Sequence, residues 1–326
     1  MSKWTQAGHS AVYLSNVCAE SPVRLRLCRS GENGVVISTY SHFKEDKPYE
    51  WNAVPLNVFL YGLDDENFRP LYASHELRIA LQANFRRTFL NDVCSAESCL
   101  SANAQWRDLV AESFVRGMYM FIVKTSPKQD LRFLNELNSR SNVNRYSGFR
   151  NNCADFALRI VNFYFPRAVH ADLLNDFGMT SPKAIARSFA KFAKRHSELD
   201  YRVIHVAQLP GDFPSSKDCR NGTEAAFRSK RWLIPMLLKS HELALFATTY
   251  FLTGRFSPEK EFEQHQGMEM GAAQLWSGDR NAFESLESAT SDKTISLSMP
   301  VARDYDNYDS IGIDSDRSTW GAVVEP

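Results

Sequence analysis

The segment Tyr146-Ser-Gly-Phe-Arg-Asn-Asn-Cys153-Ala-Asp-Phe156 places a cysteine at the first turn of a predicted buried helix. We expect that helix to run from about Asn152 to Phe165, because Pro166 stops it. A thiol acts as a nucleophile only as the thiolate, and a helix N-terminus favours the anion. Cys153 is therefore a candidate nucleophile. The alternative is a small buried apolar residue, a common role of cysteine.

A histidine stands far upstream, in the segment Gly8-His9-Ser-Ala-Val-Tyr-Leu14 at the head of a predicted strand. An imidazole beside a thiol lowers the pKa of the thiol and accepts its proton. If the fold brings His9 to Cys153, the pair is typical of a cysteine enzyme.

Strands precede helices along the chain. The alternation in Val23–Leu27, the turn Gly31–Gly34 and the β-branched run Val35–Tyr40 predict, with the strand of His9, an antiparallel meander of three strands. Apolar residues at helical spacing then predict helices over 74–90 and about 104–116. Further elements are a strand at 118–123, helices from Pro127 and Pro182, and a strand at 201–206.

The two motifs and their order resemble circularly permuted papain-like proteins. This NlpC/P60 group, which includes the lecithin retinol acyltransferase-like enzymes, carries a histidine on an early strand and a later Asn-Cys-x-x-Phe at a helix start. Here Asn152-Cys153-Ala-Asp-Phe156 matches the second motif, and Gly8-His9 opens the first. The resemblance implies an α+β fold with a permuted papain-like core and an antiparallel sheet.

The resemblance covers only the first part of the chain, and composition divides the rest. The papain-like domain covers residues 1–210, and the long interval between its two motifs implies a helical insertion at about 44–116. A helical, partly apolar extension follows at 211–286. The Ser/Asp-rich segment 287–326 is expected to be a poorly ordered tail.

By resemblance, Cys153 is the nucleophile and His9 the general base. The lecithin retinol acyltransferase-like enzymes have a second histidine on the next strand, whereas this chain reads Val35-Val-Ile-Ser38-Thr-Tyr-Ser-His42 there. Our candidates for the residue that orients the imidazole are His42 first and Ser38 second. Asn151 and Asn152 either cap the helix or contribute to an oxyanion site, and capping is the favoured role.

These residues predict a cysteine hydrolase or acyltransferase that acts on an amide or ester of a peptide, a cell-wall peptide or a lipid. The alternative is a non-catalytic binding or scaffold module with the same fold. We expect no cofactor and no metal, because zinc-ligand spacings and Gly-rich phosphate loops are missing from the sequence.

Charge and hydropathy restrict the partners. Lys plus Arg and Asp plus Glu number 38 each, so the chain lacks the basic excess of a nucleic-acid-binding protein. The apolar stretch 232–252 contains Lys239, His241 and Glu242, which favours a buried or interfacial helix pair over a spanning segment. Peripheral membrane contact through 232–252 is therefore left open.

Six cysteines permit disulfides without requiring them in a chain of this size. Cys94 and Cys99 are spaced to close a small loop in an oxidising compartment. The first residues show no charged segment followed by an apolar one, so the default expectation is a cytoplasmic location.

Overall fold

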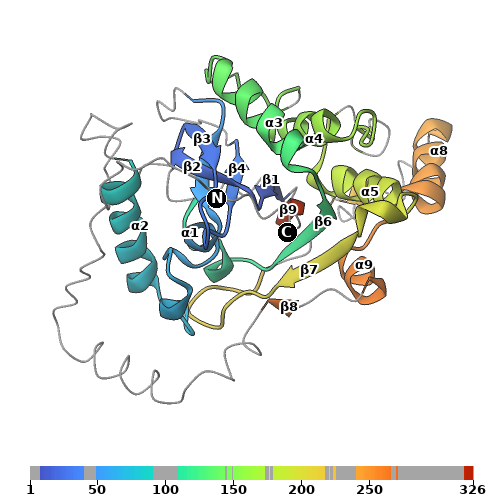
Figure 1. The fold of residues 1–326 in the computed structure, drawn as a ribbon. Coiled ribbons are helices and arrows are strands. Elements are labelled where there is room, and N and C mark those ends of the chain that lie inside the picture. Colours follow the sequence, from blue (N-terminus) through green and yellow to red (C-terminus); the bar gives the residue numbers. More distant parts are fainter. Residues whose placement is uncertain are drawn as a thin grey trace.

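The structure is a computed structural model (Figure 1). It describes residues 8–39, 49–90, 109–143, 145–148, 150–172, 176, 179–216, 220, 223–224, 240–265, 269–270 and 319–325.

Within these residues, strands make one large mixed sheet and one hairpin. The sheet has the order β5-β4-β1-β9-β6-β7-β8, and the hairpin consists of β2 and β3. Every neighbouring pair in the sheet is antiparallel except β7 and β8. The strands are β1 His9–Leu14, β2 Val17–Ser21, β3 Arg24–Leu27, β4 Val35–Ser38, β5 Asn52–Pro55, β6 Met118–Lys124, β7 Arg202–Val206, β8 Glu269–Met270 and β9 Thr319–Glu325.

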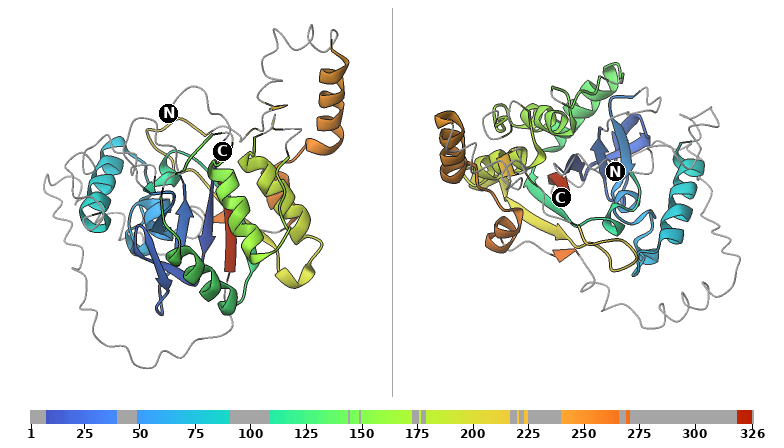
Figure 2. Two further views of the ribbon diagram at one scale, coloured as in Figure 1. Left: turned by 90° about the horizontal axis from the view of Figure 1, so that it is seen from above. Right: turned by 180° about the vertical axis from the view of Figure 1, so that it is seen from behind.

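Helices lie on both faces of this sheet, with α3, α4 and α5 on one face and α1 and α2 on the other (Figures 1 and 2). The α-helices are α1 Leu56–Tyr61, α2 His75–Phe89, α3 Pro127–Ser139, α4 Cys153–Tyr164, α5 Pro182–Ala193, α8 His241–Thr249 and α9 Pro258–Gln264. Short 3-10 turns are η1 Glu66–Phe68, η3 Glu112–Phe114 and η4 Ser197–Leu199, and η5 Tyr250–Gly254 is a π-helix turn.

The two faces of the sheet carry separate cores, because successive strand residues point to opposite faces. In β1, Val12 and Leu14 pack in the α4-side core, whereas Ala11 and Tyr13 pack in the α1-side core. The α4-side core also includes Ile37, Phe121, Phe156, Ile160 and Phe189. The α1-side core also includes Val36, Phe59, Leu81, Phe85 and Met120.

The predicted α+β class is confirmed, and so are most predicted helix starts. Ser74, Ser126 and Ser181 each accept a hydrogen bond from a backbone N–H in the first turn of the helix that follows. Each of these side chains satisfies a donor that the helix leaves unpaired. The helix predicted over 104–116 is wrong for its described part, where η3 is a single 3-10 turn.

The expectation of a poorly ordered tail at 287–326 is wrong for its last residues. Thr319–Glu325 form β9, which pairs with β1 on one side and β6 on the other. The composition of the whole segment is Ser/Asp-rich, but this stretch reads Thr-Trp-Gly-Ala-Val-Val-Glu, which suits a buried strand. The sheet therefore extends beyond the domain expected at 1–210, and residues 287–318 lie outside the described chain.

The insertion expected at about 44–116 is not purely helical either. Its segment Asn52–Pro55 is strand β5, which pairs with β4 at the edge of the sheet. The expected meander of three strands is wrong as well. This part of the chain has four strands: β1 pairs directly with β4, and β2 and β3, which lie between them in the sequence, form a separate hairpin.

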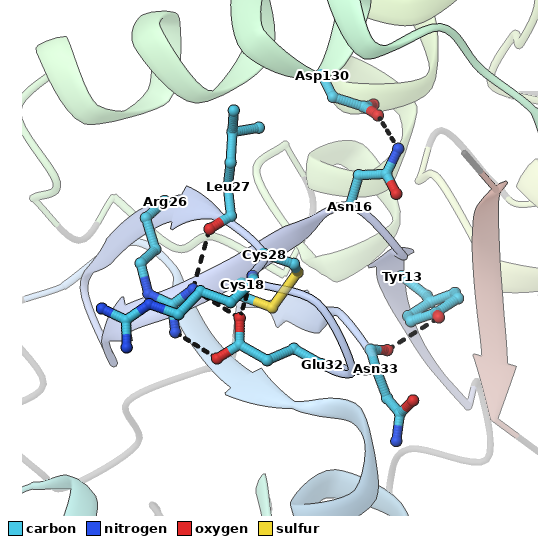
Figure 3. Close-up of a disulfide and its surroundings, with 10 residues drawn as sticks. Tyr13, Asn16, Cys18, Arg26, Leu27, Cys28, Glu32, Asn33 and Asp130 are labelled. Carbon is cyan, nitrogen blue, oxygen red and sulfur yellow. Dashed lines mark hydrogen bonds and ion pairs between the residues drawn. A yellow bond between two sulfur atoms is a disulfide. The ribbon is translucent and has the colours of Figure 1, made fainter. Parts of the chain in front are cut away.

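A disulfide between Cys18 and Cys28 closes the β2–β3 hairpin (Figure 3). Beside it, Arg26 donates two hydrogen bonds to the carboxylate of Glu32, at 2.7 and 2.6 Å. Sequence spacing did not single out this pair, and the Cys94–Cys99 loop lies outside the described residues. Disulfides are typical of oxidising compartments, so the bond argues against the expected cytoplasmic location, which stays a prediction.

The apolar stretch 232–252 is described only from residue 240 onward, where it forms α8 and the start of η5. No helix in the described parts of the chain has both the length and the apolar character needed to cross a bilayer.

Candidate functional site

Cys153 is the first residue of α4, and Asn152 is its N-cap. The Asn152 side-chain oxygen accepts hydrogen bonds from the N–H groups of Ala154 and Asp155, at 2.8 and 3.0 Å. The Asp155 carboxylate accepts in return from the backbone N–H of Asn152, at 3.1 Å, and this completes a capping box. Asn152 therefore has the capping role, and two N–H groups at the helix start are occupied by the cap.

Asn151 does not cap the helix. Its side-chain N–H donates to the carbonyl oxygen of Arg145 at 2.9 Å, and its oxygen accepts from Arg159. The backbones of Ser147 and Asn151 also exchange hydrogen bonds, at 3.1 and 3.0 Å, so the chain makes a closed turn just before α4. Asn151 thus holds the loop that leads into the helix.

The start of α4 is tied to its surroundings through the other side of Asn152. Its Nδ2 donates to the carbonyl oxygens of Gly148 and Thr180, at 3.1 and 3.0 Å. Thr180 directly precedes Ser181, the N-cap of α5. The first turns of α4 and α5 therefore lie side by side, with Cys153 buried between its helix and the sheet.

Helix α4 packs against β1. At the far end of the helix, Gln129 of α3 donates to the carbonyl oxygen of Tyr164 at 3.1 Å. The next residue, Asp130, accepts from Asn16, which lies two residues after the end of β1 (Figure 3). The end of α4 and the end of β1 are therefore close, so the starts of both elements, with Cys153 and His9, share the opposite end of the sheet.

Strand alternation determines the face on which His9 stands. Val12 and Leu14 lie under α4, so Ser10 belongs to that face, whereas His9 follows Ala11 and Tyr13 to the α1 side. His9 is buried and is the first residue of its strand. The two candidates therefore lie at one end of the sheet, with His9 on the α1 side and Cys153 on the α4 side. For a proton to pass from the Cys153 sulfur to His9, the imidazole has to extend past the end of the sheet toward α4.

A tyrosine from the loop before α4 belongs to the surroundings of Cys153. Burial raises the pKa of Tyr146, and the charges of Cys153 and Asp155 raise it further. The phenol therefore keeps its proton and is a neutral hydrogen-bond donor near the sulfur. Cys153 itself is not part of a disulfide.

Of the two candidates for orienting the imidazole, only Ser38 lies in the described chain, and His42 lies outside it. Ser38 ends β4 and stands directly opposite Asn52 of β5. Alternation puts both on the face of His9, and both side chains are almost fully buried. Among the described residues, the Ser38 hydroxyl and the Asn52 side-chain oxygen have no hydrogen-bond partner.

Asn52 is therefore a polar neighbour of the candidate site that sequence reasoning missed. The segment around it was assigned to a helical insertion, so its pairing with β4 was not considered. The signal in the sequence is the short run Asn52-Ala-Val-Pro55, whose terminal proline fits an edge strand.

Potential metal ligands come together at Cys18, Cys28 and Glu32 in the described part of the chain. The two sulfurs are bonded to each other, and the carboxylate is paired with Arg26. This group is therefore a disulfide with a neighbouring ion pair and does not offer thiolate ligands. No family model, curated protein or solved structure matches the chain, so the function has to be argued from this geometry.

Proposed function

We propose that the chain is a cysteine hydrolase or acyltransferase on a permuted papain-like core, with Cys153 as nucleophile and His9 as general base. The observation that carries the proposal is the position of Cys153. It is the first residue of a capped helix that packs on β1, the strand that begins with His9. The N-terminal end of a helix carries partial positive charge, which favours the thiolate.

In the proposed reaction, His9 takes the thiol proton and the thiolate attacks the carbonyl carbon of an amide or ester. The bond to the leaving group breaks, the leaving group takes the proton from the imidazolium, and the acyl group stays on sulfur. Water or another acceptor then attacks this thioester and gives its own proton to His9; the thiolate leaves and takes that proton back from the imidazolium, which restores the thiol and the neutral imidazole. The neutral phenol of Tyr146 supports the scheme, because it offers a donor near the anionic sulfur.

A second candidate is a non-catalytic binding module, and one specific observation favours it. Strand alternation assigns His9 to the face of the sheet that α4 does not cover. If the imidazole stays on that face, Cys153 has a packing role and the fold serves to present a surface.

The two candidates differ in covalent chemistry at Cys153. An activated ester such as p-nitrophenyl acetate should acetylate Cys153, and mass spectrometry of the intact and digested protein locates the acetyl group. Cys153→Ala should remove the adduct. His9→Asn should slow acylation by about 10²–10⁴-fold, the usual contribution of a general base.

Matched controls are Cys219→Ser, which removes another cysteine, and His205→Asn, which removes a histidine from β7. Both should react like the wild type. Equal acylation of the wild type and His9→Asn would leave His9 without a catalytic role. Absence of any adduct on Cys153 would favour the binding module.

A further inference from the structure

Helix α8 and the π-helix turn η5 present apolar side chains to solvent. Leu245 is 67% exposed, Phe251 51% and Leu252 79%. Leu245 belongs to α8, and Phe251 and Leu252 belong to the π-helix turn that directly continues it. In both views of Figure 2, α8 lies at the periphery of the molecule, outside α5.

The opposite side of the same segment holds it to the protein. Ala247 and Tyr250 are buried. The Tyr250 hydroxyl donates to the carboxylate of Glu224, which also accepts two hydrogen bonds of 2.7 Å from Lys183 of α5. This partly buried charged network fixes which side of α8 faces outward, so the exposure of the leucines is a property of the folded chain.

Positive charge accompanies this apolar surface. The exposed guanidinium of Arg255 lies 4.6 Å from the ring centre of Phe251. In the sequence leading to α8, residues 228–239 include Arg228, Lys230, Arg231 and Lys239, and this basic run is flanked by Glu224 and Glu242. A segment that combines exposed leucine and phenylalanine with basic residues is typical of segments that lie in the interface of an anionic membrane.

We propose that the docking surface formed by Leu245, Phe251, Leu252 and Arg255 binds a membrane with anionic headgroups. The leucines and the phenylalanine enter the boundary between headgroups and acyl chains, while Arg255 pairs with lipid phosphates. A second copy of the chain is a poorer occupant. Three partly exposed side chains offer roughly a few hundred Å², whereas a stable dimer buries about 800 Å² on each partner.

The docking surface is connected to the candidate site through the start of α5. Lys183 binds Glu224 in the network that anchors Tyr250, and Thr180, three residues earlier, accepts from the N-cap of the Cys153 helix. The start of α5 therefore links the docking surface to the helix that begins with Cys153. If the proposed function holds, the substrate class is an acyl ester or amide of a membrane lipid.

Vesicle sedimentation tests the docking surface directly. The full chain is mixed with vesicles of phosphatidylcholine alone or with added phosphatidylglycerol. The wild type should bind the anionic vesicles at least tenfold better. A Leu245→Glu/Leu252→Glu variant should lose tenfold or more of that binding, and Arg255→Glu should lose it in part, most visibly at low salt.

The matched control is Ile79→Glu on α2, because Ile79 is 61% exposed but lies on the other side of the sheet. It should bind like the wild type, and circular dichroism should show all variants folded. The proposal is overturned if the wild type binds neither kind of vesicle, or if Ile79→Glu weakens binding as much as the double variant. It is also overturned if light scattering shows a dimer that only the double variant dissociates.

The proposed docking surface and the proposed catalysis can be contradicted independently of each other. Cys153→Ala should bind the same vesicles as the wild type, because the docking surface does not include the thiol. If the protein binds vesicles but Cys153 is not acylated, the docking surface is supported and the proposed lipid substrate is contradicted.

Discussion

Asn152 donates a 3.0 Å hydrogen bond to the carbonyl oxygen of Thr180, and the same side chain caps the helix that begins with Cys153. One amide therefore fixes the start of α4 and joins it to the start of α5. Replacing Asn152 with Ala removes the cap and leaves buried groups unpaired, and we expect a loss of about 1–3 kcal/mol in the free energy of unfolding.

Urea denaturation measures this loss. Asn152→Asp separates the two roles, because it keeps the cap acceptor and loses the amide donor to Thr180. It should fall between Asn152→Ala and the wild type. An Asn152→Ala variant as stable as the wild type would contradict the role assigned to this residue.

Tyr146 provides a second prediction, on the reactivity of the thiol. Its phenol stays protonated because burial and the nearby charges of Cys153 and Asp155 raise its pKa. If it donates to the thiolate, a contribution of about 1 kcal/mol corresponds to roughly a fivefold change in reactivity. Tyr146→Phe should slow iodoacetamide labelling of Cys153 by about that factor.

The control for this experiment is Tyr72→Phe, which removes an exposed hydroxyl that donates to Asp212. Labelling of Cys153 should be unchanged in it. Equal rates in the wild type and Tyr146→Phe would mean that the phenol does not act on the sulfur.

Asp130 makes the stability of the chain depend on pH. Burial raises the pKa of this carboxyl, and hydrogen bonds from Tyr164, Asn16 and Thr125 offset only part of the effect. A raised pKa means that the folded chain binds the proton more tightly than the unfolded chain. This contribution to stability is complete below the ordinary value of about 4 and is lost as the pH rises through the raised value.

Asp130→Asn should therefore show a smaller fall in the free energy of unfolding than the wild type as the pH rises from about 4. Chemical denaturation at a series of pH values provides the comparison. Glu136→Gln, an exposed carboxyl on the same helix, should follow the wild type. If the free energy of unfolding changes with pH in the same way in the wild type and in Asp130→Asn, Asp130 is not the source of the pH dependence.

The disulfide between Cys18 and Cys28 should contribute about 2–3 kcal/mol, as expected for closing a loop of this length. A Cys18→Ser/Cys28→Ser variant should lose that amount in urea denaturation. The wild type with a reducing agent should lose the same amount. If reduction leaves the wild-type curve unchanged, the two cysteines are not bonded.

Two glycines of the turn before β4 form a matched pair. Gly31 and Gly34 both have φ angles in the left-handed region, at +85° and +79°. An alanine at either costs about 1–2 kcal/mol for that conformation. A Cβ at Gly34 would also collide with the carbonyl oxygen of Leu14, whereas the space around Gly31 is open.

Gly34→Ala should thus lower the free energy of unfolding by about 1–3 kcal/mol more than Gly31→Ala, the usual cost of overpacking. Thermal and urea denaturation of the two variants measure the difference. Equal losses of stability in the two variants would mean that the backbone around Gly34 shifts to make room for the Cβ without a cost in free energy.

Helix starts were predictable from the sequence because a cap is a contact between near neighbours. Ser126 and Gln129 form their capping box within four residues, and Asn152 and Asp155 do the same. The position of Cys153 in the first turn follows from such local chemistry.

Strand partners were harder to predict because they lie far apart in the chain. Nothing near Ser38 in the sequence shows that Asn52 stands opposite it, and nothing near His9 shows that β9 pairs there. The face of His9 depends on the register of the whole sheet, since a shift of one residue moves every side chain to the other face. The motifs therefore identified His9 and Cys153 as candidates, but they could not predict how the two residues lie relative to each other.

The central place of β9 also has a consequence for biosynthesis. Thr319–Glu325 are translated after the other strands that the structure describes, yet they separate β1 from β6. Until they leave the ribosome, β5-β4-β1 and β6-β7 can form only two half-sheets, each with an open edge that invites mispairing. The sheet can close only after translation of this segment, so nascent chains of this protein should depend on chaperones that shield such edges.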